Sequence, residues 1–302
     1  MSNYFLNRYE QMTGDSSEEV FVIPSRNVLR VNPLVASEEE VVSRLRGRGV
    51  ELVPVEGVSL AYEYSASFSL GSTQEYLLGM YYLQELASQL PVLALDNVVS
   101  EKGLSWSDLS VLDMCAAPGS KTTQLAAVMK NAGCLVALDV SRSRAEALAN
   151  NCERCGVSNC EVYHKDALFA SDLGVVFDVV LLDAPCCGNF CLQDDWLDTR
   201  QVTDSSQMAR EQRKLLGVAL SVLRPGGLLV YSTCSLEVEE NEGVLDSLPS
   251  SAKILPVSLP LGSSALSSWK SRVFRSDMKN ATRLWPHRDG TQGFFLAVIQ
   301  KE

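Results

Sequence analysis

From residue 111 to residue 231 the sequence alternates between short, continuously apolar runs and longer helical stretches. Five short runs read as strands, at residues 111–114, 135–138, 161–163, 177–182 and 228–231, and residues 121–130 and 142–151 read as helices between them. Strands that are apolar along their whole length must be covered on both faces, which is the situation of a parallel sheet between helices. The pattern therefore predicts a doubly wound α/β fold.

The first 70 residues have a different character. Ser37 and Glu40 form a capping box before a short amphipathic helix that Gly47 ends, and β-like runs flank it at residues 28–32 and 51–55. We expect a small α+β N-terminal domain over residues 1–70 and a second domain over residues 71–302. Five arginines of the first domain offer a basic face, with scattered surface charge as the alternative: Arg26, Arg30, Arg44, Arg46 and Arg48.

The second domain begins and ends with further elements. Ser72 and Glu75 form another capping box, and we expect its helix to continue to Leu86. Near the C-terminal end, a helix from about residue 205 to 223 is closed by a turn at 224–227. The strand-like run at 293–299 suggests an antiparallel addition at the sheet edge, and hence a mixed sheet. Residues 247–268 read as an irregular excursion.

Ligands of open α/β sheets bind at the carboxyl ends of the strands. The first strand leads into a loop of small residues whose backbone a ligand can approach closely: Cys115, Ala116, Ala117, Pro118, Gly119, Ser120 and Lys121. The next two strands end at Asp139, suited to the hydroxyls of a ribose, and at Asp166, suited to an adenine ring. No dinucleotide or Walker motif is present. The pattern favours S-adenosylmethionine over a dinucleotide.

The fourth and fifth strands end in residues that favour chemistry. Asp183 and Cys186 follow the fourth strand, and Cys234 follows the fifth, so adjacent strand ends bring them together. A buried cysteine is usually a small apolar residue, but both cysteines here come after strand ends and beside a carboxylate. Cys152 and Cys155 form a C-x-x-C pair at a helix end with no second such pair, so we predict no metal site.

At this point the sequence resembles a known family. Residues 112–122, 182–186 and 231–235 resemble the signature blocks of the Nop2/Sun (RsmB/RsmF-type) RNA cytosine-5 methyltransferases, and residues 71–75, 84–85, 224–227 and 286–290 add to the resemblance. The resemblance implies a class I methyltransferase (Rossmann-like) fold and an N-terminal RNA-binding lobe. One departure is that the family usually has Ser-Gly after the fourth-strand cysteine, whereas this chain has Cys187-Gly188 and continues through residues 189–191.

The resemblance also implies a role for each candidate residue around S-adenosylmethionine. Residues 115–121 would line its methionine side, Asp139 would hold the ribose, Asp166 would lie near the adenine, and Asp183 would sit between cofactor and target base. Cys234 would be the nucleophile and Cys186 would assist release of the product.

Two cysteines suit this reaction because cytosine C5 is a poor nucleophile. A thiolate that adds to C6 turns C5 into an enamine-like carbon able to take the methyl group. Asp183, protonated or sharing a proton with N3, would stabilise charge developing in the ring, with electrostatic help from Lys121. A base must then remove the C5 proton, for which Cys186 is a candidate. The target base must be unpaired or flipped out.

Three alternatives remain at this stage. One is a DNA cytosine methyltransferase, in which the Pro-Cys cysteine attacks; the second motif at Cys234 argues against it. Another is a non-catalytic RNA-binding assembly factor, which the intact Asp183, Cys186 and Cys234 argue against. The third concerns the substrate: the chain ends at Glu302 with no room for a further RNA-binding domain, and compact members often modify tRNA. We therefore expect tRNA, with rRNA as the alternative.

Charge is the main objection to an RNA substrate. The 302 residues carry 26 Lys plus Arg against 37 Asp plus Glu, a net charge of -11, and phosphate contacts come from basic residues. Residues 269–288 hold six basic residues and one acidic residue, Asp277, so we expect a local basic patch at the substrate cleft. No apolar run reaches the length of a membrane span and no secretory signal is visible. The nine cysteines fit reduced thiols. We expect a cytoplasmic monomer.

Overall fold

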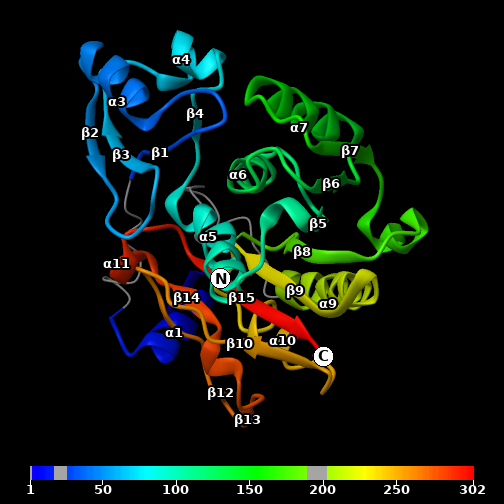
Figure 1. Ribbon diagram of the computed structural model, residues 1–302. Coiled ribbons are helices and arrows are strands. Elements are labelled where there is room, and N and C mark those ends of the chain that lie inside the picture. The colour runs from blue at the N-terminus through cyan, green and yellow to red at the C-terminus, as the bar shows by residue number, and fades with distance from the viewer. Residues whose placement is uncertain (1, 17–25, 189–202) are drawn as a thin grey trace.

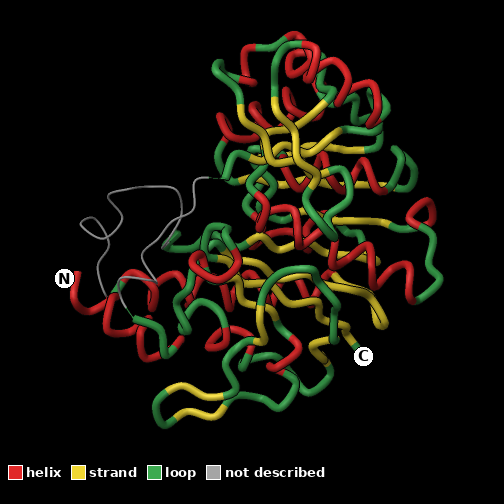
Figure 2. The backbone as a smooth tube through the Cα atoms, turned by 90° about the vertical axis from the view of Figure 1, so that its left-hand side faces the viewer, coloured by secondary structure: helices red, strands yellow, loops and turns green. Residues whose placement is uncertain are grey.

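The computed structural model describes residues 2–16, 26–188 and 203–302, which build two main sheets of different size (Figure 1). The smaller sheet has four strands in the order β2-β3-β1-β4, and the larger has nine strands. In Figure 1 the smaller sheet lies at the upper left, beside helices of the larger domain. Figure 2, turned by 90°, shows the strands running through the body with helices on either side.

The larger sheet has the doubly wound arrangement that the sequence predicts. Its order is β11-β14-β15-β9-β8-β5-β6-β7, with β10 also paired to β15. Five strands are parallel: β5 (Ser110–Asp113), β6 (Cys134–Asp139), β7 (Cys160–His164), β8 (Phe177–Asp183) and β9 (Leu223–Thr233). The last strand, β15 (Phe294–Lys301), runs antiparallel to β9. The sheet is therefore mixed, as expected, and the carboxyl ends of the parallel strands meet at one edge.

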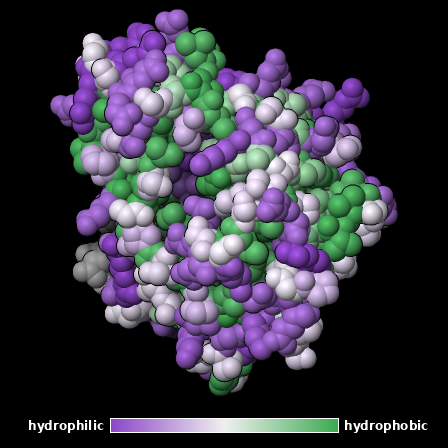
Figure 3. All heavy atoms as spheres, in the orientation of Figure 1, coloured by the Kyte–Doolittle hydropathy of each residue, from purple (hydrophilic) through white to green (hydrophobic). Residues whose placement is uncertain are grey.

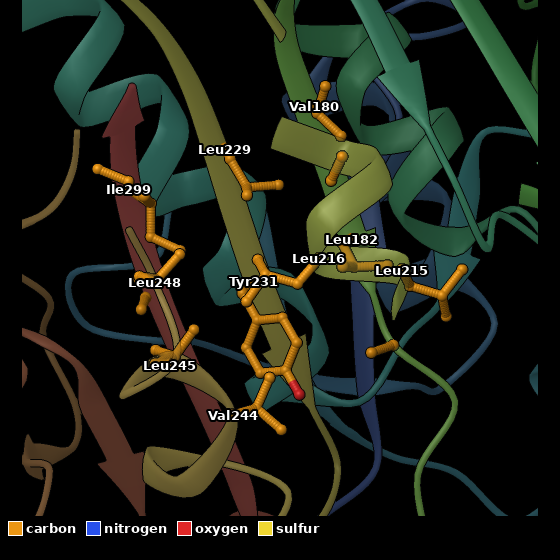
Figure 4. Close-up of a cluster of buried hydrophobic side chains, with 14 of the residues drawn as sticks. Val180, Leu182, Leu215, Leu216, Leu229, Tyr231, Val244, Leu245, Leu248 and Ile299 are labelled. Carbon is orange, nitrogen blue, oxygen red and sulfur yellow. The ribbon is translucent and has the colours of Figure 1, made fainter. Parts of the chain in front are cut away.

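Helices cover both faces of this sheet. On one face lie α5 (Leu86–Glu101), α6 (Ser120–Val128) and α7 (Arg142–Arg154), and on the other lie α9 (Asp204–Val222) and α10 (Glu242–Leu245). Alternate residues of β8 point to opposite faces: Val179 and Leu181 pack under α5 and α6, while Val180 and Leu182 pack under α9. Figure 4 shows the second core, where Tyr231 lies among leucines of the surrounding elements. Burial on both faces explains the unbroken apolar runs.

The N-terminal lobe is an antiparallel sheet covered by one helix. Its strands are β1 (Val28–Val31), β2 (Glu51–Pro54), β3 (Ala61–Ser65) and β4 (Tyr81–Leu83), and its helix is α3 (Glu38–Gly47). The predicted cap is present, because the Ser37 hydroxyl accepts a hydrogen bond from the Glu40 N–H at 3.2 Å. Val41 and Leu45 of α3 pack on Leu29 and Val31 of β1.

The single helix expected from residue 73 to Leu86 is wrong. Thr73 does cap a helix, but α4 (Gln74–Leu77) lasts one turn, β4 follows it, and α5 begins at Leu86. The chain turns at Gly79, whose φ is +73°. A Cβ added at this position would lie 1.8 Å from the Arg154 carbonyl oxygen, so only glycine fits here. Pro91 lies inside α5. The tyrosines after Gly79 pair with β1 instead of continuing the helix.

The lobe also has bounds different from residues 1–70. Strand β4 completes its sheet beyond residue 70, while α1 (Ser2–Thr13) packs on the larger domain. The Arg8 side chain of α1 pairs with Glu237 at 3.0 Å, and Asp15 pairs with His287 at 2.7 Å. The four-stranded lobe thus comprises residues 28–83. Strand β4 belongs to it because it pairs with β1, whereas ion pairs attach α1 to the larger domain.

Two expectations for the C-terminal third need correction. The turn expected at 224–227 is an irregularity within β9, whose pairing with β8 shifts between Phe177 and Val179. The irregular excursion at 247–268 contains β10 (Ala252–Leu255), which pairs with β15. The remaining short elements are η1 (Leu70–Ser72), η2 (Trp106–Asp108), η3 (Ala167–Leu173), β11 (Ser263–Ser264), β12 (Ser268–Trp269), β13 (Arg272–Val273), η4 (Met278–Asn280), β14 (Thr282–Leu284) and α11 (Pro286–Asp289).

The expected basic patch at residues 269–288 does not form as one surface. Arg283 is fully buried against Glu242, and the other three arginines pair with acids: Arg272 with Asp246, Arg275 with Asp277 and Arg288 with Asp15. The acids come mostly from distant segments, so the local sequence does not reveal this neutralisation.

Four of the five N-terminal arginines that suggested a basic face are paired or buried. Arg26, Arg44 and Arg48 pair with Glu63, Glu40 and Glu75, and Arg30 is buried, whereas Arg46 is exposed and donates to the Leu52 carbonyl at 3.4 Å. Figure 3 shows hydrophilic and apolar residues interspersed over the visible face of the molecule. None of the described helices is long and apolar enough to cross a membrane.

Candidate active site

A cavity of about 570 Å³ opens at the carboxyl ends of the parallel strands. Its volume is in the range of small-molecule sites. The described residues that line it come from the ends of β5, β6, β8 and β9, from the segment after β7 and from α7 and α9: Met114, Cys115, Ala117, Asp139, Val140, Arg144, Asp166, Ala167, Leu168, Asp183, Ala184, Pro185, Cys186, Glu211, Leu215 and Cys234. The sheet topology thus gathers into one cavity residues that are up to 120 positions apart in the sequence.

Most of the predicted site residues meet in this cavity. Its walls include both expected acids of the cofactor site, Asp139 and Asp166, together with Asp183, Cys186 and Cys234. From the small-residue loop, Cys115 and Ala117 line the cavity. The other loop residues, Ala116, Pro118, Gly119, Ser120 and Lys121, are not among the described lining residues. Gly119 has φ +108° where α6 begins, a conformation that glycine adopts without strain.

Asp139 is held in place where β6 ends. It is 3% exposed, and its carboxylate accepts hydrogen bonds from the N–H groups of Ala117 at 3.3 Å and Ser141 at 2.9 Å. Arg144 of α7 pairs with it at 3.3 Å and also donates to the Ala117 carbonyl at 2.8 Å. Val140, Ala167 and Leu168 add apolar wall beside it. A carboxylate beside an apolar wall fits the ribose and the base of a nucleoside.

Asp183 lies at the end of β8 between two donors. The Lys121 ammonium donates to one carboxylate oxygen at 2.7 Å, and the Ser232 hydroxyl donates to the other at 2.6 Å. Lys121 also donates to the Ser88 hydroxyl at 3.1 Å, and its ammonium lies 5.6 Å from the centre of the Phe294 ring. Lys121 therefore reaches the site through Asp183. The two donors fix the orientation of the carboxylate.

Cys186 and Cys234 are neighbours in space. Their sulfur atoms lie 3.2 Å apart, within hydrogen-bond distance, although 48 residues separate them in sequence. Both side chains are partly exposed to the cavity, and both follow strands that pair in parallel, β8 and β9. Two thiols beside one carboxylate can address both faces of a small planar substrate or act in sequence on it.

Cys187, the departure from the usual family pattern, is not a second cavity thiol. It is 4% exposed and its backbone N–H donates to Glu240 at 3.0 Å. Burial, with the nearby Glu240 carboxylate, raises the pKa of Cys187 above its usual range. The motif assignment to Cys186 is therefore consistent with the geometry. The continuation through residues 189–191 lies outside the described residues.

Two other titratable groups lie at or near the cavity, the buried Asp113 carboxyl group and the partly buried Cys115 thiol. Burial raises the pKa of Asp113 to about 7, although the Thr122 hydroxyl donates to it at 2.8 Å. Burial also raises the pKa of the Cys115 thiol, with help from the Asp113 and Asp183 carboxylates. A thiol kept protonated is a poor nucleophile. Cys115 thus differs from a reactive cysteine even though it lines the same cavity.

Several residues of the site are not among those that the sequence predicts. Arg144 reaches Asp139 from α7, Ser232 orients Asp183, and Glu211 and Leu215 of α9 complete the wall. Ser232 belongs to the block around Cys234, so its position there was a usable signal. The contact of Arg144 depends on how α7 packs against the loop after β5, which no local pattern reveals.

The strand order, with the cavity at the carboxyl ends of the parallel strands, is that of a class I methyltransferase. The comparisons with known proteins agree: residues 105–300 match the family described as 16S rRNA methyltransferase RsmB/F, and residues 1–86 match the N-terminal domain of 16S rRNA methyltransferase RsmF. The chain belongs to the RsmB/F family of methyltransferases, the Nop2/Sun group that the motifs indicate. The proteins of this family and fold use S-adenosylmethionine.

Individual relatives support the same assignment. Ribosomal RNA small subunit methyltransferase F of Erwinia tasmaniensis is 36% identical over 98% of this chain and 63% of its own length. The 28S rRNA (cytosine-C(5))-methyltransferase of Mus musculus is 34% identical over 92% of this chain and 35% of its own. The crystal structure of a methyltransferase homolog from Pyrococcus horikoshii has 36% identity and a TM-score of 0.85, covering 100% of this chain and 96% of that one. The chain spans about three fifths of the length of its bacterial relatives.

Proposed function

We propose that this protein is an RNA (cytosine-5)-methyltransferase that uses S-adenosylmethionine and acts through a covalent adduct of Cys234 with C6 of the target cytosine. The observation that carries the proposal is the pair of thiols, 3.2 Å apart, beside Asp183 in the cavity. A methyltransferase that modifies an already nucleophilic atom has no need of two cysteines at this place. The same intact pair argues against a non-catalytic assembly factor.

In this proposal the cofactor would lie along the part of the cavity that β6, the segment after β7 and the loop after β5 line. Asp139 would accept hydrogen bonds from the ribose hydroxyls, Asp166 and the apolar residues beside it would take the adenine, and Cys115 and Ala117 of the loop from Cys115 to Lys121 would border the methionine part. When bound, S-adenosylmethionine supplies an electrophilic methyl group. For the methyl group to meet C5, the target base must enter the cavity from the side of Cys186 and Cys234.

Cys234 begins the reaction by attack on the base. The Cys234 thiol loses its proton as its sulfur bonds to C6, and the electrons of the C5–C6 double bond move into the ring toward N3, which makes C5 nucleophilic. Asp183 relays that proton to N3, so that the negative charge pushed into the ring is neutralised, and Lys121 and Ser232 hold the Asp183 carboxyl group still during this step. An oriented group costs little reorganisation when charge develops, so Lys121 acts by fixing Asp183.

Cys186 completes the turnover. After methylation the proton on C5 must leave and the C6–sulfur bond must break, which restores the double bond and frees Cys234. The Cys186 sulfur is the described thiol beside that of Cys234, so it is placed to assist this elimination as a proton acceptor or through water.

Ribosomal RNA is the substrate class that we favour. Bacterial relatives that match more than nine tenths of this chain are named as methyltransferases of small-subunit rRNA, and the mouse relative as one of 28S rRNA. The expectation of tRNA finds no support among these names. The N-terminal lobe is the part that we assign to RNA binding: its Arg30 donates to the Ser120 carbonyl and the Thr123 hydroxyl, which ties the lobe to α6 beside the cofactor loop.

The test of this function compares substrates directly. The protein is incubated with S-adenosylmethionine labelled in the methyl group and with small-subunit rRNA, large-subunit rRNA, tRNA or DNA. Nucleosides are then separated after digestion. We expect label in 5-methylcytidine from small-subunit rRNA. Label in 5-methylcytidine from tRNA alone would overturn the substrate class, and label in another nucleoside would overturn the reaction.

Replacing Asp139 with alanine is expected to weaken S-adenosylmethionine binding by roughly 10- to 100-fold, because hydrogen bonds to a charged group contribute about 1.5–3 kcal/mol. Isothermal titration calorimetry measures the change. Glu146→Ala is the matched control, since Glu146 is an exposed acid of α7 that pairs only with Arg142 among the ion pairs found. An unchanged Kd for a folded Asp139→Ala protein would place the ribose elsewhere.

A further inference from the structure

One buried carboxylate joins the two cysteine loops. Glu240 is 0% exposed, and its two oxygens accept hydrogen bonds from different loops. One accepts from the backbone N–H of Cys187 at 3.0 Å, and the other accepts from the Ser235 hydroxyl at 2.9 Å. Cys187 directly follows Cys186, and Ser235 directly follows Cys234. Glu240 therefore bridges the residues next to both reactive thiols.

Two amide side chains extend the same network to the other neighbours of the cysteines. Gln212 of α9 donates to Glu240 at 2.8 Å and to the carbonyl of Pro185, the residue before Cys186, also at 2.8 Å. Asn241 accepts from the Thr233 hydroxyl at 2.6 Å and donates to the Ser235 carbonyl at 2.7 Å. The residues on both sides of each cysteine are thus hydrogen-bonded to this network.

We propose that Glu240 is a positioning residue of the methyl-transfer reaction, which holds Cys186 and Cys234 at the separation that attack and release require. The inference rests on the proposed function of these cysteines. Glu240 lies behind the loops and does not line the cavity, so it acts through the backbone next to the thiols. A displacement of about 1 Å at reacting groups can lower a rate roughly 100-fold.

The chemistry of the donors explains why a carboxylate stands here. The groups that face Glu240 all donate: one backbone N–H, the Gln212 amide, the Ser235 hydroxyl and the Cys187 thiol. A carboxylate is an acceptor at both oxygens. A glutamine would turn an NH₂ group toward at least one of these donors, which leaves a donor facing a donor in a buried place. The Cys187 thiol takes part as a donor to Glu240, which gives the unusual residue a role in the network.

The first arm of the test compares Glu240→Gln with Glu242→Gln. Glu242 is a matched control, because it is an equally buried carboxylate two residues further on whose donors are Arg283 and the Leu266 N–H, and not the residues next to the two cysteines. For Glu240→Gln we expect kcat to fall roughly 100-fold, while KM for S-adenosylmethionine and for RNA changes little. For Glu242→Gln we expect a lower Tm from the broken buried pair, with kcat kept. Equal kcat in wild type and Glu240→Gln would overturn the proposal.

The second arm needs no catalytic activity. We measure by mass spectrometry how fast iodoacetamide alkylates Cys186 and Cys234 in each variant. Released loops open more often, so Glu240→Gln should speed alkylation of both thiols severalfold, and Glu242→Gln should not. If wild-type protein methylates no RNA, the proposed function fails while this arm still decides the positioning role. Unchanged alkylation in Glu240→Gln contradicts it.

A third variant covers the case in which Glu240→Gln does not fold. Gln212→Leu keeps the carboxylate but removes the donor to the Pro185 carbonyl and to Glu240. We expect a smaller loss of kcat, with KM again little changed, together with faster alkylation of Cys186 than of Cys234. Loss confined to KM for RNA would contradict a positioning role at the thiols.

Discussion

Replacing Cys234 with alanine is expected to lower methyl transfer by at least about a thousand-fold, the scale on which loss of a covalent nucleophile acts. The reason is that Cys234 ends β9 at the cavity, beside Asp183, where its sulfur can reach a base held by that carboxylate. Transfer of labelled methyl groups to RNA measures the effect. Binding of S-adenosylmethionine should be retained, since the proposed cofactor contacts, Asp139 and Asp166, follow other strands, β6 and β7.

Cys134→Ala is the matched control for this variant. Cys134 is an exposed thiol at the start of β6, at the opposite end of the parallel strands from the cavity. Its loss should leave methyl transfer unchanged. A Cys234→Ala protein that is folded, binds the cofactor and still turns over at more than a tenth of the wild-type rate would remove Cys234 from the role of nucleophile.

Replacing Cys186 with alanine has a different expected result. The Cys234 thiol can still attack C6, but the elimination that frees it lacks its helper, so the covalent protein–RNA adduct should accumulate. The structure motivates this split of roles because the two sulfur atoms lie only 3.2 Å apart, at the ends of neighbouring strands. Denaturing gel electrophoresis of protein mixed with RNA and S-adenosylmethionine detects the adduct as a slower band.

The outcome of the Cys186 experiment also tests the order of the two cysteines. Wild-type protein should show little adduct, Cys186→Ala much, and Cys234→Ala none. If Cys234→Ala accumulates adduct and Cys186→Ala does not, the roles are reversed and Cys186 is the nucleophile. The variant that lacks both cysteines should form no adduct under either assignment. An adduct in this variant would come from another thiol.

The sequence predicts the central sheet well because its signal is local. The central strands β5, β6 and β8 and residues 228–231 of β9 are mostly apolar, so burial on both faces is visible in the residues themselves, whereas the edge strand β7 is largely exposed. The helix from Glu38 to Gly47 is equally well marked, by its Ser37 cap. The helix predicted for residues 74–83 is wrong because Tyr81 and Tyr82 pair with β1, and this long-range contact competes with the capped helix.

The candidate site likewise contains residues that the local sequence predicts and residues that it does not. Asp139, Asp183, Cys186 and Cys234 are predictable, because parallel strands bring their carboxyl ends to one edge and the residues that follow them must meet there. Glu240 is not predictable, because a buried acid is the least expected residue in a loop and its donors come from α9 and two different loops. Its function depends on partners that only the packed structure brings together.

The predicted basic patch shows most clearly how a local sequence pattern can differ from the folded structure. The basic residues from Lys270 to Arg288 look like an RNA-binding patch in the sequence, yet Arg283 is fully buried against Glu242. Arg288 meets Asp15 from the other end of the chain. Salt bridges between segments so far apart cannot be read from a window of sequence, so the positive surface that the net charge of -11 seemed to require is smaller than predicted.

Identification of the residue that bonds to RNA tests the central claim most directly. An RNA substrate that carries 5-fluorocytidine traps the adduct, because a fluorine on C5 cannot leave as a proton does. After digestion with protease and nuclease, mass spectrometry locates the modified peptide. We predict a methylated fluorocytidine attached to Cys234 in the peptide that follows β9. A nucleotide attached to Cys186 or Cys187, or no covalent adduct in a preparation that forms 5-methylcytidine, would contradict the account.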